Sequence, residues 1–192
     1  QYRAMYVRAQ ALVHLGRSDA ALQALDEVEV AYRTDPVLYK IYLASVALVR
    51  AEWLWRSGDT TGARRLVDEL MNDWDPAAPV PSPALRRVFL LAAELALARV
   101  DPAAAVTFSE AALKAGAAIA ADPTRSAHVG QAMLLLAQAQ RAQGLQDQAS
   151  RNLSDAIVAL GNGLGEDHAK VAGARALLAE WNTAGTALQS QR

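Results

Sequence analysis

The sequence contains no cysteine, which excludes disulfide bonds, thiolate metal sites, iron–sulfur clusters and a cysteine nucleophile. It also has no excess of charge of one sign, because 19 basic and 20 acidic residues leave a formal net charge of -1. We therefore expect no nucleic-acid partner. The longest charge-free stretches, such as 126–140, contain His and Gln and fall short of the ~20 apolar residues that cross a bilayer. We expect no membrane insertion.

The motifs of common catalytic and cofactor sites are missing as well. The sequence has no phosphate-binding loop, nucleophile elbow or dinucleotide fingerprint. Its three histidines, His14, His128 and His168, have no partner at metal-ligand spacing, and we expect His168 to bond the backbone of its own linker. The run Gly161-Asn162-Gly163 is interpreted as a loop that ends a helix. We expect no metal, no cofactor and no enzymatic activity.

What the sequence has is alanine and leucine in abundance, with Gly and Pro placed between apolar-periodic segments. This composition favours helices over strands, and Asp-Pro pairs and isolated glycines mark the helix ends. The fold class predicted is all-α. The expected helices cover residues 2–15, 19–33, 37–57, 60–73, 84–99, 102–120, 125–143, 147–161 and 168–185.

The expected tight turns recur at a nearly constant spacing. Gly16, Gly58, Arg99 and Gly144 are separated by 42, 41 and 45 residues. Five residues after each turn and seven before it stands an alanine, and all eight positions agree. A side chain larger than methyl would force two crossing helices apart, so we expect these alanines at the crossings of helix hairpins. They are Ala9, Ala21, Ala51, Ala63, Ala92, Ala104, Ala137 and Ala149.

A turn glycine followed by alanine, a bulky apolar residue and a small residue resembles the tetratricopeptide repeat (TPR). The likeness is strongest over 144–179, which is similar to the roughly 42-residue variant of kinesin light chains and bacterial signalling proteins, although Ala169 stands where that variant has proline. The resemblance implies one domain over 1–192, a right-handed α-solenoid of about four hairpins with a C-terminal capping helix at about 168–185. The repeats would cover approximately 2–35, 37–75, 84–121 and 125–164.

The resemblance also implies that the first helix of each hairpin lines a concave groove. The inward positions are basic with aromatic spots, which suits a peptide that carries carboxylates and apolar side chains. The predicted function is a protein–protein interaction or scaffold module that binds a peptide of a partner. The predicted groove residues are Arg3, Tyr6, Gln10, Glu52, Trp55, Arg56, Arg86, Phe89, Gln138 and Arg141.

Other interpretations remain open at this point. The chain starts at Gln1 without methionine, so we expect it to be attached to an N-terminal domain. It could then be the regulatory or sensor domain of a larger bacterial signalling protein such as a kinase, cyclase or transcription factor. The interpretation places it in the cytoplasm, with the periplasm as the alternative if a signal precedes Gln1. The proline-rich segment 73–83 is expected to be a long exposed connection.

Overall fold

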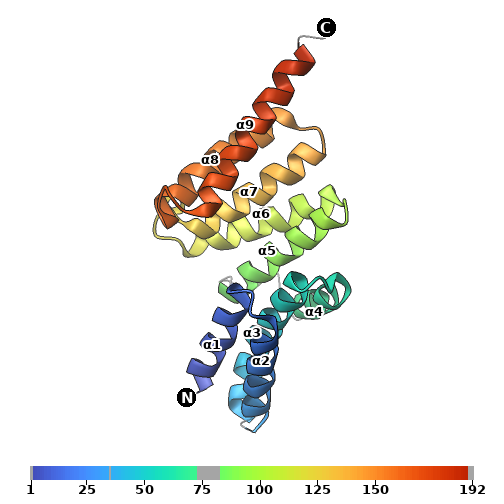
Figure 1. Ribbon diagram of the computed structural model, residues 1–192, viewed down its shortest axis with the longest axis vertical. Helices are drawn as coiled ribbons and strands as arrows, with labels where there is room; N and C mark the ends of the chain where they lie inside the picture. Colours follow the sequence, from blue (N-terminus) through green and yellow to red (C-terminus); the bar gives the residue numbers. More distant parts are fainter. Residues whose placement is uncertain (1, 35, 73–82, 190–192) are drawn as a thin grey trace. The chain divides into compact units, whose positions relative to one another are not determined.

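The computed structural model describes residues 2–34, 36–72 and 83–189, and within these ranges every regular element is a helix (Figure 1). The all-α expectation is confirmed for this part of the chain. The expected connection over 73–83 lies, except for its last residue, outside the described residues.

The chain divides into two compact units, each of which we describe by itself. The first, Gln1–Ala78, holds α1 (Tyr2–His14), α2 (Ser18–Arg33), α3 (Pro36–Arg56) and α4 (Thr60–Asn72). The second, Pro79–Arg192, holds α5 (Pro83–Ala98), α6 (Pro102–Ile119), the short 3₁₀ helix η1 (Pro123–Arg125), α7 (Ala127–Ala142), α8 (Gln146–Leu164) and α9 (Ala169–Gln189). The predicted helix ranges agree closely with these bounds, and the largest differences are at the C-terminal ends of α8 and α9.

Within each unit the helices pack in chain order. Each helix contacts the next one, α1 also contacts α3, and α5 also contacts α7. The core of the first unit is built from α1, α2 and α3 around the fully buried Leu25 and Val49. In the second unit, α7, α8 and α9 share a core around Leu153, Leu160 and Val171. The apolar face of α9 packs on α8 in this core, and its role as the cap of a solenoid stays a prediction.

Four tight turns between paired helices have the same backbone geometry. Gly16, Gly58 and Gly144 have positive φ angles of 68°, 92° and 81°, in the left-handed region that glycine enters without steric cost. In each case the next residue donates its N–H to the carbonyl five positions back, as in a Schellman helix ending. The four bonds measure between 2.9 and 3.0 Å and join Arg17 to Leu12, Asp59 to Leu54, Asp101 to Ala96 and Leu145 to Gln140.

The third turn lies one residue later in the chain than the sequence pattern predicts. The residue with positive φ there is Val100, at 59°, and not Arg99. Counting from Val100, the crossing alanines become Ala93 and Ala105, and both are 0% exposed. Ala104, selected by the sequence register, is only half-buried. The six alanines counted from the other three turns are all 0% exposed, as close helix crossings require: Ala9, Ala21, Ala51, Ala63, Ala137 and Ala149.

Val100 is a β-branched residue in a conformation that β-branched side chains avoid, and 85% of its surface is exposed. We expect Val100→Gly to raise the free energy of unfolding by about 1 kcal/mol, because relief of left-handed strain outweighs the extra chain entropy of glycine. Urea denaturation measures the change. The converse variant Gly144→Val should destabilise, and a Val100→Gly protein less stable than the original would contradict the turn geometry.

The glycines near the end of α8 have a different role from the predicted one. Gly161 and Gly163 lie inside α8, which ends at Leu164 and is capped by Gly165 with a φ of 95°. A Cβ on Gly163 would lie 2.5 Å from the backbone nitrogen of Ala127, where no side chain fits. The interpretation of Gly161-Asn162-Gly163 as a helix-ending loop is therefore wrong. Its second glycine instead allows α8 to approach the start of α7.

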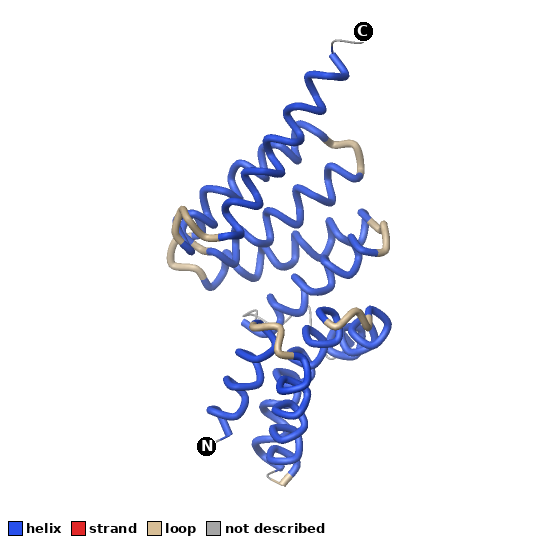
Figure 2. Tube along the Cα trace, in the orientation of Figure 1, coloured by secondary structure: helices blue, strands red, loops and turns tan. Residues whose placement is uncertain are grey.

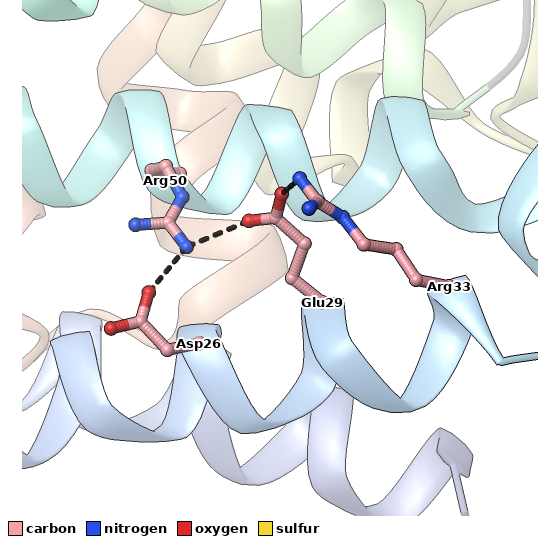
Figure 3. Close-up of polar contacts among 4 residues, drawn as sticks. All are labelled: Asp26, Glu29, Arg33 and Arg50. Carbon is pink, nitrogen blue, oxygen red and sulfur yellow. Dashed lines mark hydrogen bonds and ion pairs between the residues drawn. The ribbon is translucent and has the colours of Figure 1, made fainter.

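An ion-pair network joins α2 to α3 in the first unit (Figure 3). Nη2 of Arg50 lies 2.7 Å from Oδ1 of Asp26 and 2.9 Å from Oε2 of Glu29, and Arg33 binds the other oxygen of Glu29 at 2.6 Å. The side chain of Arg50 is 23% exposed, so these contacts are partly shielded from water. Asp26 and Glu29 of α2 are thus both paired within the first unit.

Candidate functional site

A groove of about 290 Å³ lies in the second unit between α5, α7 and α9. The helices α7 and α9 run in the same direction, because Lys170 at the start of α9 contacts Gln131 near the start of α7, and Trp181 further along contacts Arg141 at its end. The same side of each helix therefore faces the groove over several turns. The lining residues are Glu94, Gln131, Leu134, Leu135, Gln138, Lys170, Gly173, Ala174 and Leu177.

One end of the groove is polar. Nζ of Lys170 donates to Oε1 of Gln131 at 3.2 Å, and Nε2 of Gln131 donates to Oε1 of Glu94 at 3.4 Å. These two bonds link all three helices and fix the orientation of the Gln131 amide.

The floor of the groove is apolar. Leu134 and Leu177 are half-buried and pack against the α7–α8–α9 core, with Ala174 beneath them. Gly173 has open space where a side chain would be. A ligand could therefore bury apolar surface here while its polar groups reach Gln138 and the polar end.

At the end of α7 a cation lies over an aromatic ring. The Arg141 guanidinium carbon is 5.2 Å from the centre of the Trp181 ring, and Trp181 is 8% exposed. Arg141 lies three residues after the groove residue Gln138 on α7, and this cation–π contact reduces the freedom that its side chain would lose on binding an anion.

Only part of the predicted set for the second unit lies at this groove. Gln138 lines it, Arg141 lies one helical turn further along α7, and Arg86 and Phe89 are 7% and 3% exposed and are buried in the unit. Arg86 and Phe89 were wrongly predicted to face the groove because the third turn was placed at Arg99. When positions are counted from Val100, each inward position of α5 moves by one residue. The shifted positions include Glu94, which is the α5 residue that lines the groove.

The groove residues of α9 were not predicted. Lys170, Gly173 and Leu177 belong to a helix that the sequence pattern assigned only to capping. They lie 39 residues after Gln131, Leu134 and Gln138, so a search for the inward pattern at a slightly shorter period would have found them.

In the first unit the predicted residues lie on α1 and α3, which contact each other. Arg3 and Arg56 are exposed, and the others are half-buried. The half-buried residues are Tyr6, Gln10, Glu52 and Trp55. A single groove that joins these residues to those of the second unit stays a prediction.

A larger depression of about 780 Å³ lies on α1 and α2, with Met5, Leu22 and Val30 among its apolar residues. None of its lining residues belongs to the predicted set. Two of its acidic groups already have partners: Asp26 pairs with Arg50 and Glu27 with Arg8. The groove of the second unit has polar groups better placed for recognition.

Two ionisable groups with perturbed pKa values lie on the groove-forming helices, His128 at the start of α7 and Arg86 in the first turn of α5. Partial burial and then the positive charges of Arg86, Lys170 and Arg87 lower the pKa of His128. Burial, followed by the charge of Arg87, also lowers the pKa of Arg86. The neutral form of His128 is therefore favoured at neutral pH.

His168 behaves as predicted, since its Nδ1 accepts the backbone N–H of Lys170 at 3.1 Å at the start of α9. Within 2–34, 36–72 and 83–189, no three His, Asp or Glu side chains come together in a way that could hold a metal ion. In the same ranges, no helix is both long and apolar enough to cross a membrane.

Comparison with known proteins adds no family to this description. No protein-family model matches the chain, and no curated protein matches its sequence.

Proposed function

We propose that this protein is an interaction module built of TPR-like helix hairpins, and that it binds a peptide segment of a partner protein. In the second unit the binding surface is the groove between α5, α7 and α9. The observation that carries the proposal is the composition of this groove, with an apolar floor, hydrogen-bonding amides and a lysine on three neighbouring helices.

The repeated turns support the TPR-like arrangement. Four turns with one hydrogen-bonding pattern recur at spacings of 42, 42 and 44 residues, and small buried residues flank each of them. Equivalent turns place equivalent helices in equivalent directions, so the first helices of successive hairpins present similar faces.

The groove chemistry favours a peptide with both apolar and acidic side chains. Leu134 and Leu177 offer contact area of the kind that drives association, and Gln138 can bond a peptide backbone. Lys170 supplies positive charge in the groove and Arg141 supplies it one helical turn beyond Gln138, and the carboxylate among the lining residues is that of Glu94. Charge complementarity of this kind mainly sets the rate of association and the choice of partner.

The test begins with peptides selected from a displayed random library on the full chain. Lys170→Glu and Gln138→Ala should each weaken the selected peptides about ten-fold, equivalent to about 1.4 kcal/mol, in fluorescence polarisation. Both residues are peripheral enough for helicity to be retained, which circular dichroism checks.

Arg151→Glu is the matched control, because Arg151 is exposed on α8 and does not line the groove. If the selected peptides bound the Lys170→Glu protein normally but no longer bound the Arg151→Glu protein, the binding site would not be the groove between α5, α7 and α9. A library that yields no binder at all would also count against the proposal.

A further inference from the structure

Basic side chains gather at the N-terminal ends of three helices in the second unit. Arg86 lies in the first turn of α5, His128 is the second residue of α7, and Lys170 is the second residue of α9. The first turns of these helices contain no acidic residue. A helix N-terminus itself carries partial positive charge, so basic side chains are least favourable there. Stability alone does not account for this placement.

The loops that lead into α7 and α9 lie at the same end of the second unit, opposite the loop between α7 and α8 (Figure 2). His128 and Lys170 are thereby brought together. The positive charges of Arg86, Arg87 and Lys170 all act on the ring of His128. One small anion could interact with several of these groups.

Arg86 is the most unusual member of this group. The residue is 7% exposed, and its Nε is buried without any hydrogen-bond partner. Its Cδ lies 3.5 Å from the point that a Cβ on Gly116 would occupy, so the stem of the side chain packs tightly against α6. Within the described ranges no carboxylate pairs with this guanidinium. A buried cation without a counter-charge is strongly unfavourable, and binding of an anion would relieve it.

We propose that Arg86, His128 and Lys170 form a binding site for a phosphate group, either free or as a phosphate monoester. A carboxylate carries one negative charge, which a single arginine would neutralise. A phosphate carries between one and two negative charges at neutral pH and offers three strong acceptor oxygens, which matches two cationic side chains and one imidazole N–H donor on three helices. The site goes beyond the proposed peptide groove, because Arg86 and His128 do not line that groove and phosphate could bind without a peptide.

The experiment measures inorganic phosphate binding to the full chain by calorimetry and by thermal unfolding. At matched ionic strength, phosphate should raise the Tm more than chloride or acetate does. Arg86→Met should raise the Tm in the absence of phosphate, since it removes the unpaired charge, and should weaken phosphate binding by about ten-fold or more. Arg151→Met, an exposed charge on α8, should leave phosphate binding unchanged.

His128 supplies a second readout that does not depend on the folding of the Arg86 variant. In NMR titrations its ring pKa should rise when sulfate, which keeps a fixed charge, neutralises Arg86, Arg87 and Lys170 around it. The His128 side chain is partly shielded but remains accessible to solvent, so His128→Ala should weaken phosphate binding several-fold without loss of structure. An unchanged His128 pKa, equal Tm shifts with acetate and phosphate, or full phosphate binding by Arg86→Met would each overturn the proposal.

Two ligands distinguish the source of the phosphate. A phosphoserine peptide that binds at least ten-fold more tightly than phenyl phosphate would identify a phosphorylated partner. Equal affinities would identify a small phosphate ligand. If the peptide library yields no binder while phosphate still binds, the groove proposal fails and the phosphate site stands.

Discussion

Removing α9 is expected to lower the free energy of unfolding of the second unit by about 5 kcal/mol, because each large apolar side chain that is buried contributes roughly 1.5–3 kcal/mol. The deletion of residues 166–192 takes Val171, Ala174 and Trp181 out of the core, where they are 0%, 2% and 8% exposed. It also uncovers Leu153 and Leu160 on α8. A loss of this size is comparable to the whole stability of many domains.

The truncated protein should therefore melt at a much lower temperature and associate through the exposed face of α8. Calorimetry and light scattering measure the two effects. A point variant gives the control: Trp181→Ala should cost about 3 kcal/mol, and Glu180→Ala, at an exposed position on the same helix, should cost almost nothing. A deletion protein as stable and as monomeric as the original would mean that α9 is a tail with no part in the core.

Enlarging the alanines at the hairpin crossings is expected to have the next largest effect. Ala63 and Ala149 are 0% exposed, and leucine at either site adds three heavy atoms where two helices meet. Overpacking of this kind should lower the free energy of unfolding by about 1–3 kcal/mol. Ala176→Leu on the exposed face of α9 should be nearly neutral.

The third repeat sharpens this experiment. Ala105 is 0% exposed and Ala104 only half-buried, so Ala105→Leu should destabilise more than Ala104→Leu. If denaturant unfolding showed that Ala104→Leu destabilises more than Ala105→Leu, the alanine positions counted from Arg99 would be the correct ones. Equal melting temperatures for Ala63→Leu and the original protein would show that the alanine positions are not helix crossings.

The sequence could place the helices because their signals are local. Asp101 and Ser126 accept backbone N–H groups at the starts of α6 and α7, and Gly165 ends α8, so each boundary depends on a few neighbouring residues. The repeat was readable for a similar reason, since close crossings restrict a position to alanine wherever they occur.

The candidate site was only partly predictable, because side-chain exposure depends on the neighbouring helices. Glycine is the usual signal for a left-handed turn, and the third turn has Val100 instead, so a pattern of residue types could not locate it. Because the turn was predicted one residue too early, the sequence pattern selected Arg86, which is buried, and missed Glu94, which faces the groove. The residues that α9 contributes to the groove were missed because the sequence of a terminal helix does not show which helices lie beside it.

By itself the sequence determined the all-helical class, the helix bounds, the repeat near 42 residues and the alanines at most of the crossings. These features follow from backbone propensity, capping and local steric limits, which act over a few residues. Only the tertiary structure decided that Arg86 is buried without a counter-charge, that Gly163 is a contact glycine within α8, and that α5, α7 and α9 share a groove. Burial and charge environment are properties of residues far apart in the chain, and they become defined only when the helices pack.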